Sequence, residues 1–108
     1  MAEPRMTIPT QRVLRVLLED ATAELYGAEI GDRAELASGT VHPILARLER
    51  NGWLESRWED VDPRAEGRPA RRYYRLTGSG AQQAREALTR AYRPHRSAFV
   101  PRPVTDQP

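Results

Sequence analysis

The chain has 108 residues, the size of a single domain, and its 17 basic and 15 acidic residues give a formal net charge of +2. It contains no cysteine, which excludes disulfide bonds, thiolate metal sites and thiol catalysis. No apolar run is long enough to span a membrane and the N-terminus lacks the pattern of a signal peptide, so we expect a cytoplasmic protein without a membrane partner.

The basic residues, all of them arginine, are unevenly distributed along the chain. Residues 1–46 hold four arginines and seven acidic residues, whereas residues 47–108 hold thirteen arginines and eight acidic residues. This asymmetry indicates an anionic partner for one face of the protein, with an ordinary solvated surface as the alternative.

Three amphipathic helices are predicted in the first half of the chain, at about residues 10–20, 26–34 and 40–51. The third shows apolar residues at i, i+3, i+4 and i+7, namely Val41, Ile44, Leu45 and Leu48. Thr7 or Thr10 can cap the first helix. In the third helix, an N-cap at Thr40 puts Pro43 where no N–H is needed. An N-cap at Ser38 would cost a hydrogen bond, so we expect the helix to begin after Thr40 and to end near Gly52.

Beyond Gly52 the pattern changes to the alternation of a β-strand, over residues 53–58 and again over residues 71–76. The segment between them, residues 60–70, is rich in proline and glycine and is predicted to be the loop of a hairpin. We expect Trp58 to share the buried face of the first strand with Leu54. Trp53 lies on the opposite face, and the pattern does not decide whether it is buried. A place for either tryptophan in a ligand pocket is the alternative.

A fourth helix is predicted at residues 79–94. Ser79 begins a capping box, Thr77 is an alternative cap, and Pro94 is expected to end the helix. Its apolar stripe is mostly alanine, which allows the close approach of another helix, either from the same domain or from a second chain. Residues 95–108 show no periodicity and are expected to form a disordered tail.

Three helices, a two-stranded hairpin and a further helix follow one another in the order of a winged helix-turn-helix. The expected fold is therefore mainly α with a small β-hairpin. Residues 1–78 are predicted to form a winged helix-turn-helix DNA-binding domain, followed by the C-terminal helix.

The face of the third helix opposite its apolar stripe is suited to DNA. Small residues allow the helix to enter a major groove, Arg47 and Arg50 can donate to guanine edges or phosphates, and Thr40 can bind a phosphate at the helix start. The hairpin adds five arginines within residues 64–75, which can follow a DNA backbone, with a solvated charged wing as the alternative. The candidate DNA-binding residues are Ser38, Gly39, Thr40, His42, Pro43, Arg47, Arg50, Arg68, Arg71, Arg72 and Tyr73.

Arg71 and Arg75 share a strand face with Tyr73, which favours stacking of guanidinium groups on the ring.

Other kinds of site find little support in the sequence. His42 and His95 are the only histidines and lie far apart along the chain, so we expect no metal. No nucleophile elbow and no phosphate-cradling glycine loop is present, so we expect neither an enzyme nor a cofactor.

Three segments of the chain resemble the PadR family of transcriptional regulators: LYGAEIGDRAEL, SGTVHPILARLERNGWLESRWED and RRYYRLTGSG. The resemblance covers about residues 25–80. It implies a winged-helix repressor in which the helix at residues 39–50 reads DNA and the hairpin at residues 53–76 is the wing. The C-terminal dimerisation helix, residues 79–94, would pair with the first helix of a second subunit. The candidate dimer contacts are Val13, Leu14, Leu17, Ala84, Leu88, Ala91 and Tyr92.

The chain departs from the family pattern at two places, because His42 stands where the family usually has tyrosine and the C-terminal helix is short. The resemblance implies a homodimer that represses transcription from double-stranded DNA with inverted half-sites. Since family members often respond to phenolic compounds, drugs or stress signals, it also implies a small apolar effector. The alternatives are a winged helix that serves as a protein-interaction module without DNA binding, and a metal- or redox-sensing regulator, against which the lack of cysteine counts.

Overall fold

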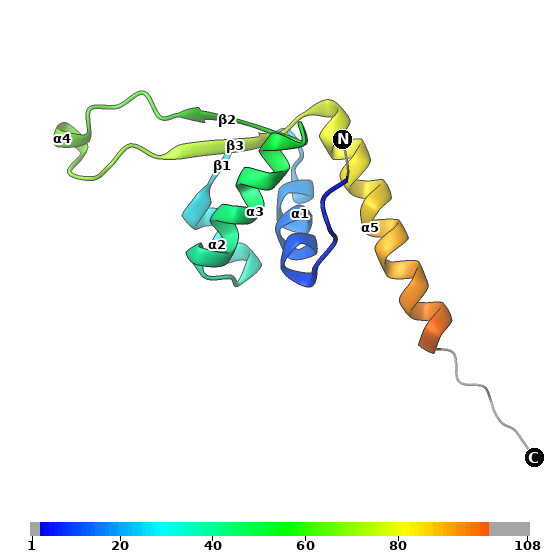
Figure 1. Ribbon diagram of the computed structural model, residues 1–108. Coiled ribbons are helices and arrows are strands. Elements are labelled where there is room, and N and C mark those ends of the chain that lie inside the picture. The colour runs from blue at the N-terminus through cyan, green and yellow to red at the C-terminus, as the bar shows by residue number, and fades with distance from the viewer. Residues whose placement is uncertain (1–2, 100–108) are drawn as a thin grey trace, which may run out of the picture.

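The structure, a computed structural model, describes residues 3–99, with side chains described as far as Tyr92. Helices α1 (Ile8–Glu19), α2 (Gly27–Ala34) and α3 (Ser38–Arg50) form the body of the protein. Strands β2 (Leu54–Trp58) and β3 (Arg72–Leu76) form a long hairpin that extends to one side of this body, and α5 (Gly78–Phe99) extends from the other side (Figure 1). The predicted winged helix-turn-helix with a C-terminal helix is confirmed.

The sheet has a third strand that the sequence did not indicate. β1 (Leu25–Tyr26) is only two residues long and pairs antiparallel with β3, so the strand order is β1-β3-β2. In the hairpin Leu54 pairs with Leu76 and Trp58 with Arg72. A two-residue strand has too few residues to show an alternation, and only its pairing with β3 identifies it.

The start of α3 differs from the prediction. The helix begins at Ser38 with Ala37 as its N-cap, so Thr40 is not the cap and Pro43 lies inside the helix, at its sixth position. Proline there cannot donate to the carbonyl of Gly39, four residues earlier. Gly39 is exposed, so water can satisfy that oxygen, and the lost bond costs less than it would in a buried helix. Gly52 adopts φ +79°, as predicted, and turns the chain from α3 into β2.

The connection between β2 and β3 was predicted to be a loop, but it contains the short helix α4 (Pro63–Glu66). Asp62 caps this helix by accepting from the N–H of Arg64 at 3.0 Å, and Gly67 ends it with φ +72°. The tip of the wing is therefore a short capped helix and not an irregular loop.

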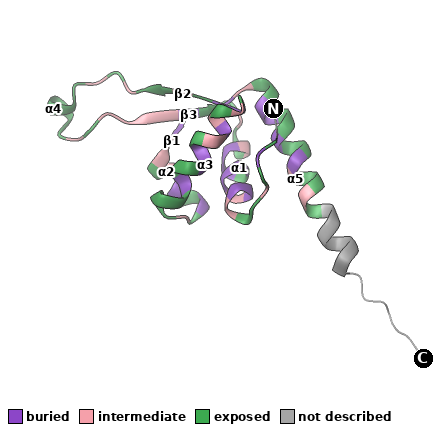
Figure 2. Cartoon of the chain, in the orientation of Figure 1, coloured by how far each residue is buried: buried purple, intermediate pink, exposed green. Residues whose placement is uncertain are grey.

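The two tryptophans differ in burial, and the sequence predicts burial only for Trp58. Trp53 is 2% exposed and belongs to the core, whereas Trp58 is 60% exposed. The prediction for Trp58 was wrong because the hairpin leaves the helical body before its end. The alternation of β2 thus continues where there is no core for its inner face to contact (Figure 2).

The core lies between α1, α2, α3, the base of the hairpin and the first half of α5 (Figure 2). Four of the residues predicted to contact a second subunit are buried in this core: Val13, Leu14, Leu17 and Ala84. The prediction was wrong for these four, because the alanine stripe of α5 packs on its own chain. Leu88 and Ala91 are half-buried and Tyr92 is 60% exposed, so the prediction for these three stands untested.

The fourth predicted helix is longer than expected at its C-terminal end. Thr77, the alternative cap, accepts from the N–H of Gly80 at 2.9 Å. The helix continues through Pro94 to Phe99, since one proline removes one hydrogen bond without ending the helix. Of the predicted tail, residues 95–99 are therefore helical, and residues 100–108 lie outside the described residues.

Candidate nucleic-acid interface

One face of α3 is buried and the opposite face is open. Val41, Ile44, Leu45 and Leu48 are in the core, as predicted. The opposite face exposes the residues of the first turn and of the predicted DNA-contacting surface: Ser38, Gly39, Thr40, His42, Pro43, Ala46 and Arg50. Arg47 is half-buried. Among the residues that the structure describes, none forms an ion pair with Arg47 or Arg50.

The start of α3 lies against the start of α2 through a contact that the sequence did not reveal. A Cβ added at Gly27 would lie 3.1 Å from Cε1 of His42, so the imidazole packs directly over the glycine. Glycine at this position allows His42 to stay close to α2 while the rest of the ring remains exposed. Gly27 belongs to the YG pair quoted above, but its partner lies fifteen residues further along the chain and only the tertiary structure identifies it.

Three arginines of the hairpin donate hydrogen bonds to carboxylates. Arg57 binds Glu24 at 2.7 and 2.8 Å, Arg75 binds Glu55 at 2.7 and 3.0 Å, and Arg68 binds Glu59 at 2.7 and 3.0 Å through both oxygens. Of the predicted DNA-binding residues, Arg68 is therefore engaged within the wing. Sequence reasoning missed this pairing because Glu59 precedes α4 and Arg68 follows it, and only the folded segment brings the two together.

Hydrogen bonds hold two of these carboxylates in their charged form. The hydrogen bond from Arg68, joined by one from the N–H of Arg71, lowers the pKa of Glu59 to about 2. The hydrogen bond from Arg57 likewise lowers the pKa of Glu24 below its ordinary value. These two ion pairs stabilise the wing: Arg68–Glu59 lies within the hairpin, and Arg57–Glu24 joins the hairpin to the residue before β1.

Two further arginines lie on aromatic rings. The guanidinium carbon of Arg71 is 4.3 Å from the ring centroid of Tyr26, and that of Arg72 is 5.2 Å from the ring centroid of Trp58. Tyr73 meets Tyr26 edge to face with centroids 5.7 Å apart. Stacking was predicted between Arg71 or Arg75 and Tyr73, but the guanidinium that lies over Tyr73, at 5.1 Å, belongs to Arg57 on the neighbouring strand.

A groove of about 660 Å³ separates the start of α2 and α3 from the wing. It brings together four of the predicted DNA-binding residues, His42, Arg68, Arg71 and Arg72. None of its lining residues is acidic, so the groove combines positive charge with aromatic surface. It is lined by Tyr26, Gly27, Ala28, His42, Trp58, Arg68, Pro69, Ala70, Arg71, Arg72 and Tyr74. Such a channel beside an exposed helix suits a phosphate backbone.

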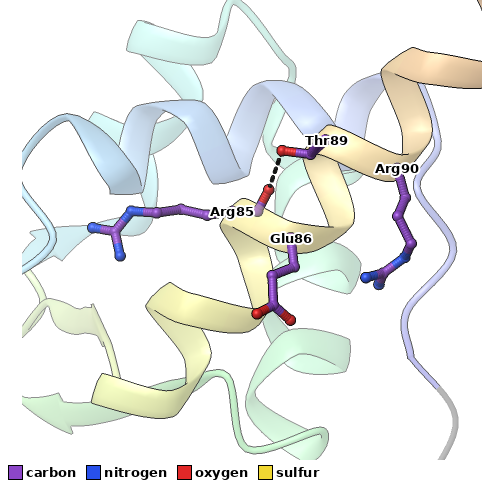
Figure 3. Close-up of a pocket in the computed structure, with 4 residues that line it drawn as sticks. All are labelled: Arg85, Glu86, Thr89 and Arg90. Carbon is purple, nitrogen blue, oxygen red and sulfur yellow. Dashed lines mark hydrogen bonds between the residues drawn. The ribbon is translucent and has the colours of Figure 1, made fainter.

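A second hollow lies on α5, away from α3 and the wing. Figure 3 shows its lining residues, Arg85, Glu86, Thr89 and Arg90, all from one helix. The hydroxyl of Thr89 donates to the carbonyl of Arg85 at 2.9 Å, and Arg90 pairs with Glu3 of the N-terminal segment. No predicted DNA-binding residue lies in this hollow.

Among residues 3–92, whose side chains the structure describes, there is no cluster of three or more metal-ligating side chains. Within residues 3–99, no helix is sufficiently long and apolar to cross a membrane.

An exposed, arginine-bearing third helix, an acid-free basic groove beside it and a long wing define a winged helix-turn-helix protein of the DNA-binding class. The model of the Transcriptional regulator PadR-like family matches residues 13–86. The chain belongs to this family of DNA-binding transcriptional regulators, which are not enzymes.

Solved structures show the same fold. PcaV, a transcriptional regulator from Streptomyces coelicolor that was crystallised with its natural ligand, is 26% identical with a TM-score of 0.68. The match covers 94% of this chain and 67% of PcaV. A PadR-like transcription factor from Bacteroides fragilis is 23% identical, with a TM-score of 0.65 over 84% of this chain and 86% of its own.

A PadR family regulator from Eggerthella lenta is 22% identical, with a TM-score of 0.65 over 84% of this chain and 81% of its own. No curated protein matches the chain.

Proposed function

We propose that the protein is a homodimeric repressor that binds an operator of two inverted half-sites. The observation that carries the proposal is the exposed face of α3, where Arg47 and Arg50 extend without an ion-pair partner among the described residues. Cations left unpaired on the open face of a recognition helix are available to guanine edges and phosphates. Occupation of a promoter by such a protein would block transcription.

Within one half-site, α3 lies in the major groove. The residues on its exposed side are small at Gly39, Pro43 and Ala46, which lets the helix approach the base edges. Arg47 and Arg50 donate to bases or to the phosphates that flank them. Ser38, Gly39, Thr40 and His42 lie at the helix start, where free N–H groups, a hydroxyl and an imidazole can hold a phosphate.

The wing contacts the neighbouring backbone. The guanidinium groups of Arg71 and Arg72 lie over the rings of Tyr26 and Trp58, and contact with a ring does not use the charge that attracts phosphate. Arg68 acts differently from Arg71 and Arg72, because it fixes the wing through Glu59 before DNA arrives. Tyr73 packs against Tyr26 and supports the sheet from its other face.

A second subunit would pack along α5. Leu88, Ala91 and Tyr92 remain accessible on this helix, and Ile8 at the start of α1 is also exposed. Because a two-fold axis between two copies relates their recognition helices, these helices would enter successive major grooves about 34 Å apart. A small apolar effector bound between the subunits would change this spacing and release the DNA.

The proposal is tested with a duplex selected by the wild-type protein from a random-sequence library, and a scrambled duplex of the same length. Binding is followed by fluorescence anisotropy over a range of salt. We expect two protomers per selected duplex and a log–log salt slope of about −0.9 per phosphate neutralised. Arg47→Ala with Arg50→Ala should abolish the preference for the selected duplex.

Arg15→Ala with Arg85→Ala is the matched control, since both arginines are exposed, one on α1 and one on α5, and their removal loses the same two charges outside α3 and the wing. Equal losses in the control and in the α3 variant, or binding that does not depend on salt, would contradict the proposal. An interaction module without DNA binding would present apolar residues where α3 exposes Arg50 and Ala46, so the observed face does not favour that alternative.

A further inference from the structure

Among residues 3–92, a single ion pair joins the recognition helix to the wing. Nη2 of Arg72 in β3 lies 3.6 Å from Oε2 of Glu49 in the last turn of α3. The same carboxylate oxygen accepts a hydrogen bond of 2.6 Å from the hydroxyl of Ser56 in β2. Glu49 therefore holds both strands of the hairpin to α3, and both of its contacts are half-buried.

The Glu49–Arg72 pair is looser than the three hydrogen-bonded ion pairs of the wing. Arg57, Arg68 and Arg75 each approach a carboxylate oxygen to 2.7 Å, the usual length of a charge-assisted hydrogen bond. At 3.6 Å, Arg72 is attracted by Glu49 without donating a hydrogen bond to it. Arg72 is also held by the ring of Trp58 and by the hydroxyl of Tyr74, neither of which is an anion that competes with phosphate for its charge.

The position of the pair matters as much as its length. Arg72 lines the groove between α3 and the wing, where none of the lining residues is acidic, whereas Glu55 and Arg75 pair on the opposite face of the hairpin. A phosphate entering the groove would meet Arg72 with Glu49, 3.6 Å away, as the competing anion.

We infer that Glu49 withholds Arg72 from DNA. It is a positioning residue that competes with phosphate for the guanidinium and so lowers the affinity for any duplex. Arg72 exchanges the loose contact with Glu49 for a closer one with a phosphate when the protein binds. This inference rests on the proposed DNA binding, and it adds a residue of the recognition helix that opposes binding.

The test is Glu49→Gln, which removes the charge but can still accept from Ser56. We expect affinity for both the selected and the scrambled duplex to rise about threefold, the size expected for a partly exposed ion pair. The salt slope should steepen by about 0.9, because one more phosphate is neutralised. In an Arg72→Ala background, Glu49→Gln should give no gain.

Glu55→Gln is the matched control, since it makes the same change of net charge beside another arginine of the hairpin, on the face away from the groove. An equal gain in this control would mean that net charge alone acts, and would overturn the inference. A loss of affinity in Glu49→Gln, together with a lower melting temperature, would overturn it as well, because Glu49 would then only hold the wing in place. If the wild-type protein binds neither duplex, the proposed function fails first and the inference falls with it.

Discussion

Gly80 is the position at which the smallest substitution should have the largest effect on the architecture. It lies in the first turn of α5, is buried, and packs on the backbone of the residue that leads into β2. A Cβ at this position would lie 2.1 Å from the carbonyl oxygen of Trp53 and 2.6 Å from its Cα. Neither atom belongs to a flexible side chain, so Gly80→Ala must push α5 away from the base of the wing.

The cost of this displacement can be estimated from the contacts it disturbs. The N–H of Thr77 donates to the carbonyl of Trp53 at 3.0 Å, and its hydroxyl donates to that of Gly52 at 2.9 Å. Overpacking costs about 1–3 kcal/mol, and each strained hydrogen bond adds up to about 1 kcal/mol. We therefore expect a loss of about 3 kcal/mol, which lowers the melting temperature by roughly 10–20 °C for a domain of this size.

The matched control is Gly78→Ala, two residues earlier in the same helix. Gly78 is exposed and an added Cβ meets nothing within 4 Å, so alanine there should leave the melting temperature unchanged or raise it by a few degrees. Both variants are compared with the wild type by circular dichroism and differential scanning calorimetry. Melting of Gly80→Ala within about 2 °C of Gly78→Ala would refute the close packing of α5 on Trp53.

Three further predictions concern the recognition helix, the core and the wing. Arg47→Ala should cost about 1–3 kcal/mol of discrimination at one base pair of the selected duplex, measured against single-base variants; a uniform loss at all positions would assign Arg47 to phosphate instead. Trp53→Ala should lower the free energy of unfolding by about 3–5 kcal/mol in chemical denaturation, whereas Trp58→Ala should change it by less than about 1 kcal/mol, and similar values for both would contradict their assigned burial. Because the folded-state pKa of Glu59, about 2, lies below its ordinary value of 4.5, its contribution to stability is present above about pH 4.5 and is lost as the pH falls toward about 2. The melting temperature of the wild type should thus approach that of Glu59→Gln over this acid range, and parallel curves would show that the Arg68 pair adds no stability.

The wing illustrates how far residue types alone can be taken. Its five arginines within residues 64–75 correctly indicate a basic hairpin. Counting charges nevertheless treats these arginines as equivalent. The structure separates Arg68 and Arg75, which donate hydrogen bonds to carboxylates, from Arg71 and Arg72, which lie over aromatic rings and donate no hydrogen bond to a carboxylate of the described residues through their side chains. This division changes which substitutions should affect DNA binding.

Periodicity alone was sufficient for the inner face of α3, for the existence of the hairpin and for the order of the elements, because each depends on residues close together in the chain. It was insufficient wherever two distant segments meet. The burial of Val13 and Ala84 within one protomer depends on α1 meeting α5, and the burial of Trp53 depends on the base of the hairpin meeting that core. The ion pair between α3 and the wing likewise joins Glu49 to Arg72, 23 positions further along the chain. Local sequence determines which side of an element is apolar, whereas tertiary packing decides what that side contacts and which charges remain free for a partner.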